Sequence, residues 1–280
     1  MQFAMATSDE YQCVFEAFIK AGWTPVKLFL SSGENRQVIT RALELQIPIQ
    51  NSPITQTDLA DLKWLKCHAL VVASYQWKIP DWQSFMPYAI NFHPSPLPLG
   101  RGPYPLIRAI SENYTDWAIT CHKINEQYDS GDILDSEPYL IDADETLESL
   151  KLKTLLSSVK LAERIATDLA VLWEAATPQK TGSYWPLWAE QERTIDFTQS
   201  ITSIMRQIRA FGDIECIAVL NDLNIYVHRA SSWSEAHNHA AGKVVFSSNL
   251  ALVVSAVDGF VAITEWSFNE PNAVIAHLRK

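Results

Sequence analysis

Two kinds of hydrophobic pattern alternate along the first two-thirds of the chain. Short strand-like runs lie at 2–6, 25–30, 69–74, 88–93 and 117–123, and helical spacing occurs at 11–21, 35–45, 55–65 and 145–175. The run ALVVAS at 69–74 is almost wholly apolar, which is typical of a central parallel strand buried on both faces. This order of elements predicts an α/β fold with a Rossmann-like, doubly wound, mostly parallel sheet.

The pattern changes after Pro178. The segment TGSYWPLW (181–188) follows neither period and is interpreted as a linker. A short helix is then predicted at 200–210, and short strands follow at 216–220, 224–229, 242–246, 251–256 and 260–266. Short strands at close spacing indicate a small barrel. We therefore expect a larger domain at residues 1–184 and a smaller OB-like β-barrel domain at residues 185–280.

Composition narrows the class of protein. Among the 280 residues, 48% are hydrophobic and 19% are charged, which predicts a globular chain, and the formal net charge is −10. Nucleic-acid binders usually present a basic face, so this charge argues against a nucleic-acid partner. No apolar run approaches the about 20 residues that span a bilayer, and no signal peptide is recognised. The four cysteines lack metal-site spacing. We expect a cytoplasmic protein with reduced thiols, no membrane partner and no metal.

A loop rich in proline and glycine follows the strand predicted at 88–93. Four prolines and two glycines between residues 94 and 103 predict a defined loop conformation, because proline fixes φ and glycine permits unusual φ. Ligands of open α/β sheets bind outside the carboxyl ends of the strands. Strand alternation also places Asn91 and His93 on the same face, at this end of the strand.

A second polar cluster follows the next strand, at Asp129 and Gly131. If Asp129 faces the same crevice as His93, then an amide, an imidazole and a carboxylate converge there. Such a set suits acyl transfer to an amine, because the imidazole and carboxylate can manage protons and the amide can donate to an oxyanion. Each residue alone has a structural alternative: a hydrogen-bonded histidine, a turn-forming asparagine, and an Asx-turn at Asp129.

The motifs INFHPSPLPLGRGPYP (90–105) and DSGDIL (129–134) together resemble the folate-dependent formyltransferases. This family includes methionyl-tRNA formyltransferase, nucleotide-sugar N-formyltransferases and the formyltransferase of purine synthesis. The segment VVASYQWKIP (71–80) is similar to the family's folate-side strand and loop. The segments TGSYWPLW, RTIDF (193–197) and IRAF (208–211) resemble the linker and C-terminal domain of the tRNA and sugar branches.

The resemblance implies a catalytic role for residues 1–184 and a donor substrate, 10-formyltetrahydrofolate, with no metal. It implies that Asn91 polarises the formyl oxygen, that His93 stabilises the oxyanion and shuttles protons, and that Asp129 takes the proton of the attacking amine. It also implies a set of folate contacts, with the last three as a pocket wall: Tyr75, Gln76, Trp77, Asn125, Glu126, Gln127, Tyr128, Pro96, Leu97 and Pro98.

The acceptor amine is less defined. The stretch at 31–35 is short and not basic, where the tRNA branch carries a long basic loop, and residues 190–280 hold seven Lys or Arg against ten Asp or Glu. We therefore expect a small-molecule amine, first of all an amino sugar on a nucleotide. Methionyl-tRNA, another small amine, a hydrolase that releases formate, and a non-catalytic folate-binding module stay open as alternatives. The oligomeric state stays open too.

Several other residues receive structural interpretations. Aromatic residues Trp77, Tyr104 and Trp185 could stack on a base or sugar, but packing in the core or linker is the preferred interpretation. Alternation places His122 on the face of Thr120, and we interpret it as structural. The group His228, His237 and His239 lies near a loop-like, Ala-rich segment and is not expected to bind metal.

Overall fold

The computed structural model describes residues 1–31 and 33–269, in two compact units. The first unit contains residues 1–105, 116–140 and 152–185. The second unit contains residues 106–115, residues 141–151 and the chain from residue 186 onward. The domain boundary expected between residues 184 and 185 stays a prediction.

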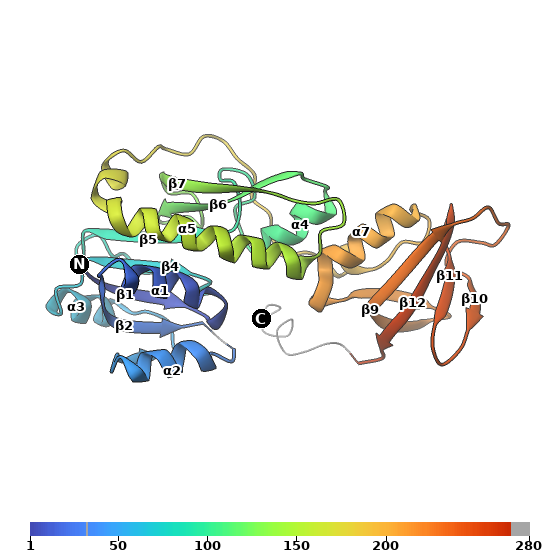
Figure 1. Ribbon diagram of the computed structural model, residues 1–280, viewed down its shortest axis with the longest axis horizontal. Coiled ribbons are helices and arrows are strands. Elements are labelled where there is room, and N and C mark those ends of the chain that lie inside the picture. Colours follow the sequence, from blue (N-terminus) through green and yellow to red (C-terminus); the bar gives the residue numbers. More distant parts are fainter. Residues whose placement is uncertain (32, 270–280) are drawn as a thin grey trace. The chain divides into compact units, whose positions relative to one another are not determined.

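A seven-stranded sheet forms the centre of the first unit, in the order β3-β2-β1-β4-β5-β6-β7 (Figure 1). The strands are β1 (Gln2–Thr7), β2 (Thr24–Leu30), β3 (Ile49–Gln50), β4 (Ala69–Ala73), β5 (Tyr88–His93), β6 (Asp116–Lys123) and β7 (Ile133–Leu140). Neighbours from β3 to β5 pair in parallel, whereas β6 and β7 pair antiparallel. The predicted mostly parallel sheet is therefore confirmed.

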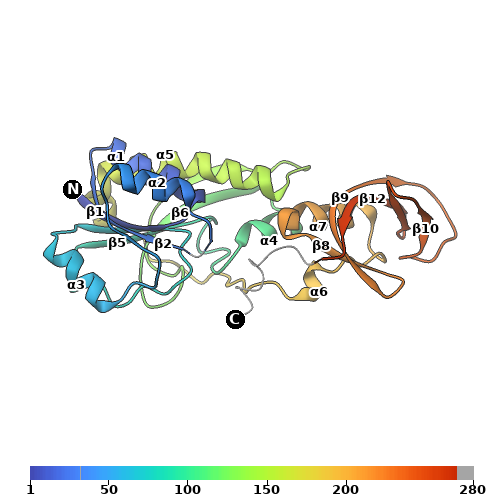
Figure 2. The ribbon, with the colours of Figure 1, turned by 90° about the horizontal axis from the view of Figure 1, so that it is seen from below.

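Helices cover both faces of this sheet, which confirms the doubly wound arrangement (Figure 2). On one side lie α1 (Gln12–Lys20), α2 (Arg36–Glu44) and α5 (Leu147–Glu174), and on the other lies α3 (Gln56–Trp64). The unit also contains the short helix η1 (Asp9–Tyr11). Helix α4 (Pro105–Ser111) begins at Pro105, the last residue of the first segment of this unit, and its other residues belong to the second unit. Along β1, Phe3 and Met5 pack toward α1 while Ala4 and Ala6 pack toward α3. This alternation shows why a central strand must be apolar on both faces.

Local sequence signals account for several of these element boundaries. Helix α3 begins with a capping box, in which Thr55 Oγ1 accepts from the Asp58 amide and Asp58 Oδ2 accepts from the Thr55 amide. The single long helix predicted at 145–175 is only partly correct. Helix α5 is interrupted at Asp168, whose φ of −121° and ψ of 21° are not helical.

The second unit is built on a curled, antiparallel half-barrel sheet in the order β10-β11-β12-β9-β8. Its elements are α6 (Glu190–Arg193), α7 (Ile201–Phe211), η2 (Gly212–Ile214), β8 (Cys216–Leu220), β9 (Leu223–Ser234), β10 (Val244–Ser247), β11 (Leu252–Ser255) and β12 (Gly259–Ser267). Helix α7 contacts β8, β9 and β12, and buries Ile204 and Ile208. The predicted OB-like β fold is confirmed. Within residues 1–31 and 33–269, none of the helices has the length and apolarity needed to cross a bilayer.

Candidate functional site

Strands β5 and β6 bring four polar side chains to one face of the sheet. In their antiparallel register, Asn91 lies opposite His122 and His93 lies opposite Thr120. The intervening residues, such as Phe92 and Cys121, are buried in the core on the side of α5. Because successive side chains of a strand point to opposite faces, the polar set points away from that core.

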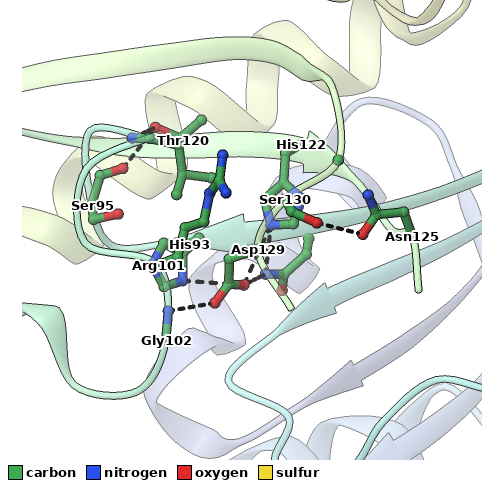
Figure 3. A network of polar contacts seen from close by, with 12 residues as sticks. His93, Ser95, Arg101, Gly102, Thr120, His122, Asn125, Asp129 and Ser130 are labelled. Carbon is green, nitrogen blue, oxygen red and sulfur yellow. Dashed lines mark hydrogen bonds and ion pairs between the residues drawn. The ribbon is translucent and has the colours of Figure 1, made fainter. Parts of the chain in front are cut away.

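Asp129 joins this polar set from the turn between β6 and β7 (Figure 3). Its Oδ2 accepts a hydrogen bond of 2.9 Å from the Gly102 amide, and its Oδ1 accepts one of 3.3 Å from Asn91 Nδ2. The same Oδ1 lies 3.5 Å from His93 Nδ1 and 3.6 Å from His122 Nε2. Asp129 has a φ of 52°, a left-handed conformation that is uncommon outside glycine and recurs at functional sites.

The hydrogen bonds of His93 define its tautomer. Its Nε2 lies 2.8 Å from the carbonyl oxygen of Gly100, and a carbonyl can only accept, so Nε2 carries a proton. Nδ1 is therefore the nitrogen that faces Asp129. Burial of the imidazole lowers the pKa of His93 below its usual 6.5, although Asp129 and the Gly100 carbonyl favour the charged form. At neutral pH this ring presents an unprotonated Nδ1 to the site.

The carboxylate of Asp129 is ionised at neutral pH. Burial raises its pKa, but the neighbouring His93 and His122 and the Gly102 amide outweigh that effect and lower the pKa of Asp129 to about 2. Its side chain is only 12% exposed, so these neighbours act with little screening by water. The site thus pairs a carboxylate that is charged at neutral pH with a neutral imidazole that can accept one proton.

The linker holds the proline- and glycine-rich loop in place. The Arg101 amide donates to the Ser183 carbonyl at 3.0 Å, and the Trp185 amide donates to the Arg101 carbonyl at 2.7 Å. Gln179 connects the loop to the Asp129 turn, since it accepts from Arg101 Nε at 2.9 Å and donates to the carbonyls of Asp129 and Gly131. The segment predicted as a linker is therefore also a brace for the site.

Position 102 requires glycine for two reasons, its backbone conformation and its close contact with the linker. Its φ is +100°, and a Cβ at this position would lie 2.4 Å from the carbonyl oxygen of Trp185. A side chain here would displace the linker or the loop, and with it the amide that donates to Asp129. The glycine of the Arg-Gly pair in the motif is therefore needed for this backbone conformation and this close contact.

The residues predicted to bind folate lie in three segments of the first unit. Tyr75 and Trp77 follow β4 and contact each other edge to face, with ring centroids 5.2 Å apart. Pro96 and Pro98 are half-buried and Leu97 is buried. The remaining predicted contacts, exposed in this structure, are Gln76, Asn125, Glu126, Gln127 and Tyr128. Their assignment to folate stays a prediction.

Two site features were not predicted from the sequence. His122 was interpreted as structural, yet its Nε2 lies 3.0 Å from Asn91 Nδ2 and 3.6 Å from Asp129 Oδ1. Gln179 was not singled out, although it bonds to the Asp129 turn through both of its amide hydrogens. Trp185 stacks on Trp117 with centroids 6.0 Å apart, which agrees with the packing interpretation of that ring.

In the described part of the chain, no three His, Cys, Asp or Glu side chains are grouped so that they could hold a metal ion. His237 instead donates from Nε2 to the Gly259 carbonyl at 3.0 Å and accepts the His239 amide at Nδ1. His228 forms an ion pair with Glu215. These contacts give the three histidines of the second unit structural partners.

Two models of known protein families together match most of the sequence. The profile described as "Formyl transferase" matches residues 15–163, more than half of the chain, and "Formyl transferase, C-terminal domain" matches residues 189–277. A methionyl-tRNA formyltransferase of Coprothermobacter proteolyticus is 33% identical over 176 residues, which are 61% of this chain and 57% of the relative. The match therefore spans less than two-thirds of that relative's length.

Solved structures share the fold at lower identity. The N-formyltransferase from Helicobacter canadensis, in complex with folinic acid and dTDP-3-aminofucose, superposes with a TM-score of 0.68 at 18% identity, covering 95% of this chain and 99% of that one. HypX from Aquifex aeolicus, in complex with tetrahydrofolic acid, gives a TM-score of 0.66 at 18% identity, covering 94% of this chain and 43% of HypX.

Proposed function

Because this chain belongs to the formyl transferase family, we propose that it moves a formyl group from 10-formyltetrahydrofolate to an amine, using Asn91, His93 and Asp129. The contact of these side chains is the observation that carries the proposal: Asp129 Oδ1 lies 3.3 Å from Asn91 Nδ2 and 3.5 Å from His93 Nδ1. All three belong to the predicted catalytic domain, residues 1–184. They offer a donor for the formyl oxygen and a path for one proton.

Each side chain has one task in the proposed reaction. The bound donor supplies a formyl carbon attached to a folate nitrogen. Asn91 donates an amide N–H to the formyl oxygen as that oxygen gains negative charge. Asp129 accepts a proton from the amine as its nitrogen bonds to the formyl carbon, and the unprotonated Nδ1 of His93 receives this proton. His93 returns it to the folate nitrogen as the carbon–nitrogen bond of the donor breaks, so one proton moves overall.

The resting pKa of Asp129, about 2, makes it a weak base before substrates bind. One of its hydrogen bonds comes from Asn91, at 3.3 Å. If the formyl oxygen takes this N–H, the carboxylate loses a bond that stabilises its charged form, and its basicity rises. The base thus becomes stronger only when the donor is in place.

We assign the donor to the loops after β4, β5 and β6, which carry the predicted folate contacts. The half-buried rings of Tyr75 and Trp77 form an apolar wall at the end of β4, and Pro96 offers a second apolar surface. The exposed turn Asn125–Tyr128 adds polar groups on a short loop. Apolar walls with a few polar groups fit a flat heterocycle that has polar edges.

We propose an amino sugar on a nucleotide as the acceptor. The overall charge of −10 and the acidic excess at residues 190–280 disfavour a polyanion as large as tRNA. The Helicobacter canadensis enzyme, whose complex holds dTDP-3-aminofucose, aligns with this chain over nearly its full length. Methionyl-tRNA is the second candidate, because the relative from Coprothermobacter proteolyticus is a methionyl-tRNA formyltransferase.

The test is formyl transfer by the purified full chain from 10-formyltetrahydrofolate to a panel of amines. The panel contains dTDP-3-aminofucose, methionyl-tRNA and a simple amine, and mass spectrometry reports the formylated product. We expect turnover with the nucleotide-linked amino sugar that Asp129→Asn abolishes. Binding of the folate without turnover of any amine would indicate the binding module, and formate release without an acceptor would indicate a hydrolase.

Salt dependence separates the two acceptor classes. The KM for a nucleotide sugar is expected to change little between low and moderate ionic strength, because few phosphate contacts are made. A protein that holds tRNA through many phosphates loses affinity steeply over the same range. A steep rise in the KM of the acceptor with salt would favour the tRNA substrate.

A further inference from the structure

The amide of Asn91 has both of its N–H groups engaged inside the protein. Asn91 Nδ2 lies 3.0 Å from His122 Nε2 and 3.3 Å from Asp129 Oδ1. One of these hydrogens must be released before Asn91 can donate to a formyl oxygen, which the proposed function requires. The partner that stays bound then decides where the amide points.

The tautomer of His122 makes it an acceptor toward Asn91. Its Nδ1 lies 2.8 Å from the carbonyl oxygen of Lys123, and since a carbonyl only accepts, Nδ1 carries the proton. In the neutral ring Nε2 then has a lone pair, which accepts from the Asn91 amide. The ring is 2% exposed and cannot exchange this partner for bulk water.

The two bonds of Asn91 differ in length and in the place of their acceptors in the fold. His122 lies directly opposite Asn91 in the β5–β6 register, so both backbones are fixed by the sheet. Asp129 lies in a turn, and its bond to Asn91 is the longer one. At 3.3 Å this bond is slightly longer than most N–H···O hydrogen bonds, and Asp129 keeps the Gly102 amide as a donor when Asn91 turns away.

We infer that His122 is a positioning residue: it holds one N–H of Asn91 throughout the reaction, so that the other N–H can turn from Asp129 to the formyl oxygen. This inference rests on the proposed function. It also fixes the orientation of the amide, because a flipped Asn91 would place its oxygen against the lone pair of His122 and the charge of Asp129. His122 itself need not touch either substrate.

Two substitutions of similar size distinguish a hydrogen-bond acceptor role of His122 from a packing role. In His122→Gln the side-chain oxygen reaches the position of Nε2 and can accept from Asn91. In His122→Asn the side chain reaches only the position of Nδ1, so the contact with Lys123 is kept and the acceptor is lost. We expect His122→Asn to lower kcat at least about tenfold with little change in either KM, and His122→Gln to stay within about threefold of wild type.

Equal losses in the two variants would overturn the inference, because they would indicate a packing role. Near-normal kcat in His122→Asn, or a change confined to KM, would overturn it as well. A readout without turnover uses ¹⁵N-labelled wild type: the imidazole shifts of His122 should show Nδ1 protonated and Nε2 bare, and the opposite tautomer would contradict us. If wild type transfers no formyl group to any amine, the proposed function fails, while this spectrum still tests the hydrogen bond.

Discussion

The first and second units each contain a buried carboxylate beside a histidine, and the two carboxylates behave in opposite ways. Asp129 and Glu215 both have left-handed backbone angles, with φ of 52° and 65°. Both lie close to a histidine nitrogen. Yet the pKa of Asp129 is lowered to about 2, while burial raises the pKa of Glu215 above its usual 4.5 despite the attraction of His228.

The difference lies in the number of donors that each carboxylate has. Asp129 faces two histidines and accepts N–H groups from Gly102 and Asn91. Glu215 bonds to His228 through Oε1, and within the described residues its buried Oε2 has no hydrogen-bond partner. A buried carboxylate keeps its charge only where donors replace the water it has lost. By this criterion Asp129 keeps its charge in the folded protein, whereas Glu215 is ionised less readily.

The largest expected effect comes from removing the charge at Asp129. Asp129→Asn should lower turnover at least about a hundredfold, the scale for losing a general base, with the fold preserved. Glu215→Gln should leave turnover unchanged. Asp132→Asn is the matched control within the same motif, because Asp132 pairs with Lys123 outside the cluster. Steady-state kinetics of the three variants decides the comparison, and near-normal turnover in Asp129→Asn would remove its assigned role.

His93 should show a similar contrast with the histidine of the second unit. His93→Ala removes the nitrogen that lies 3.5 Å from Asp129 and should lower turnover by about a hundredfold. His228→Ala should not change turnover, although it deprives Glu215 of its partner. Circular dichroism of both variants checks that the fold is kept. A comparable loss of turnover in both variants would indicate a general effect of removing a buried histidine, and it would contradict the role assigned to His93.

The pH dependence of stability should differ in sign between the two carboxylates. Because the folded-state pKa of Asp129 is about 2 against a usual 3.8, its charge stabilises the fold by about 2 kcal/mol above pH 4, and this is lost as pH falls toward 2. The raised pKa of Glu215 acts in reverse: its contribution is complete below pH 4.5 and is lost as pH rises through the folded-state value.

Urea unfolding of wild type, Asp129→Asn and Glu215→Gln between pH 7 and pH 2 measures both trends. The stability deficit of Asp129→Asn should shrink as pH falls from about 4 to 2. Any advantage of Glu215→Gln should shrink as pH falls from 7 toward 4.5. Parallel curves for the two variants would contradict the difference between the two carboxylates.

The smallest expected effect concerns the Gly102 amide, which is the backbone donor to Asp129. Gly102→Ala places a Cβ 2.4 Å from the Trp185 carbonyl and moves the amide that donates to Asp129, so turnover should fall by about tenfold. Gly22→Ala is the control, since Gly22 has a φ of +85° and no atom within 4 Å of the new Cβ. It should cost only backbone strain, about 1 kcal/mol, in urea unfolding. Equal losses of stability and turnover in both variants would mean that the contact with Trp185 is unimportant.

Much of the fold follows from patterns that are local in the sequence. Strand β5 was predicted at 88–93 and ends at His93, because Pro94 cannot continue the strand. The sequence did not reveal β7 (Ile133–Leu140), whose outer side chains are polar and which contains Pro138. As an edge strand it pairs with β6 on one side and makes an isolated bridge from Ile133 to Thr177 on the other. Polar side chains and proline are tolerated in such a strand. Asp135 and Glu137 pair there with Arg164, a contact that no periodicity reveals.

The sequence predicted those residues of the candidate site that lie in recognisable motifs. Asn91, His93 and Asp129 were found from two motifs, and the family resemblance is confirmed by both profile matches. The role of His122 depends on the register of two antiparallel strands, in which it lies opposite Asn91. Strand alternation gives the face of a residue but not its neighbour on the next strand. Gln179 was missed for the same reason, since its partners lie about 50 residues earlier in the chain.

The brace formed by the linker sets a lower limit on the length of any active fragment. Gln179, Ser183 and Trp185 all bond to the loop or turn that holds Asp129, and all lie beyond residue 163, where the first family match ends. A fragment truncated at 163 would lack all three, and one cut after residue 184 would lose the amide that donates to the Arg101 carbonyl. Fusion partners, tags and protease sites intended to separate the two halves therefore belong after Trp185.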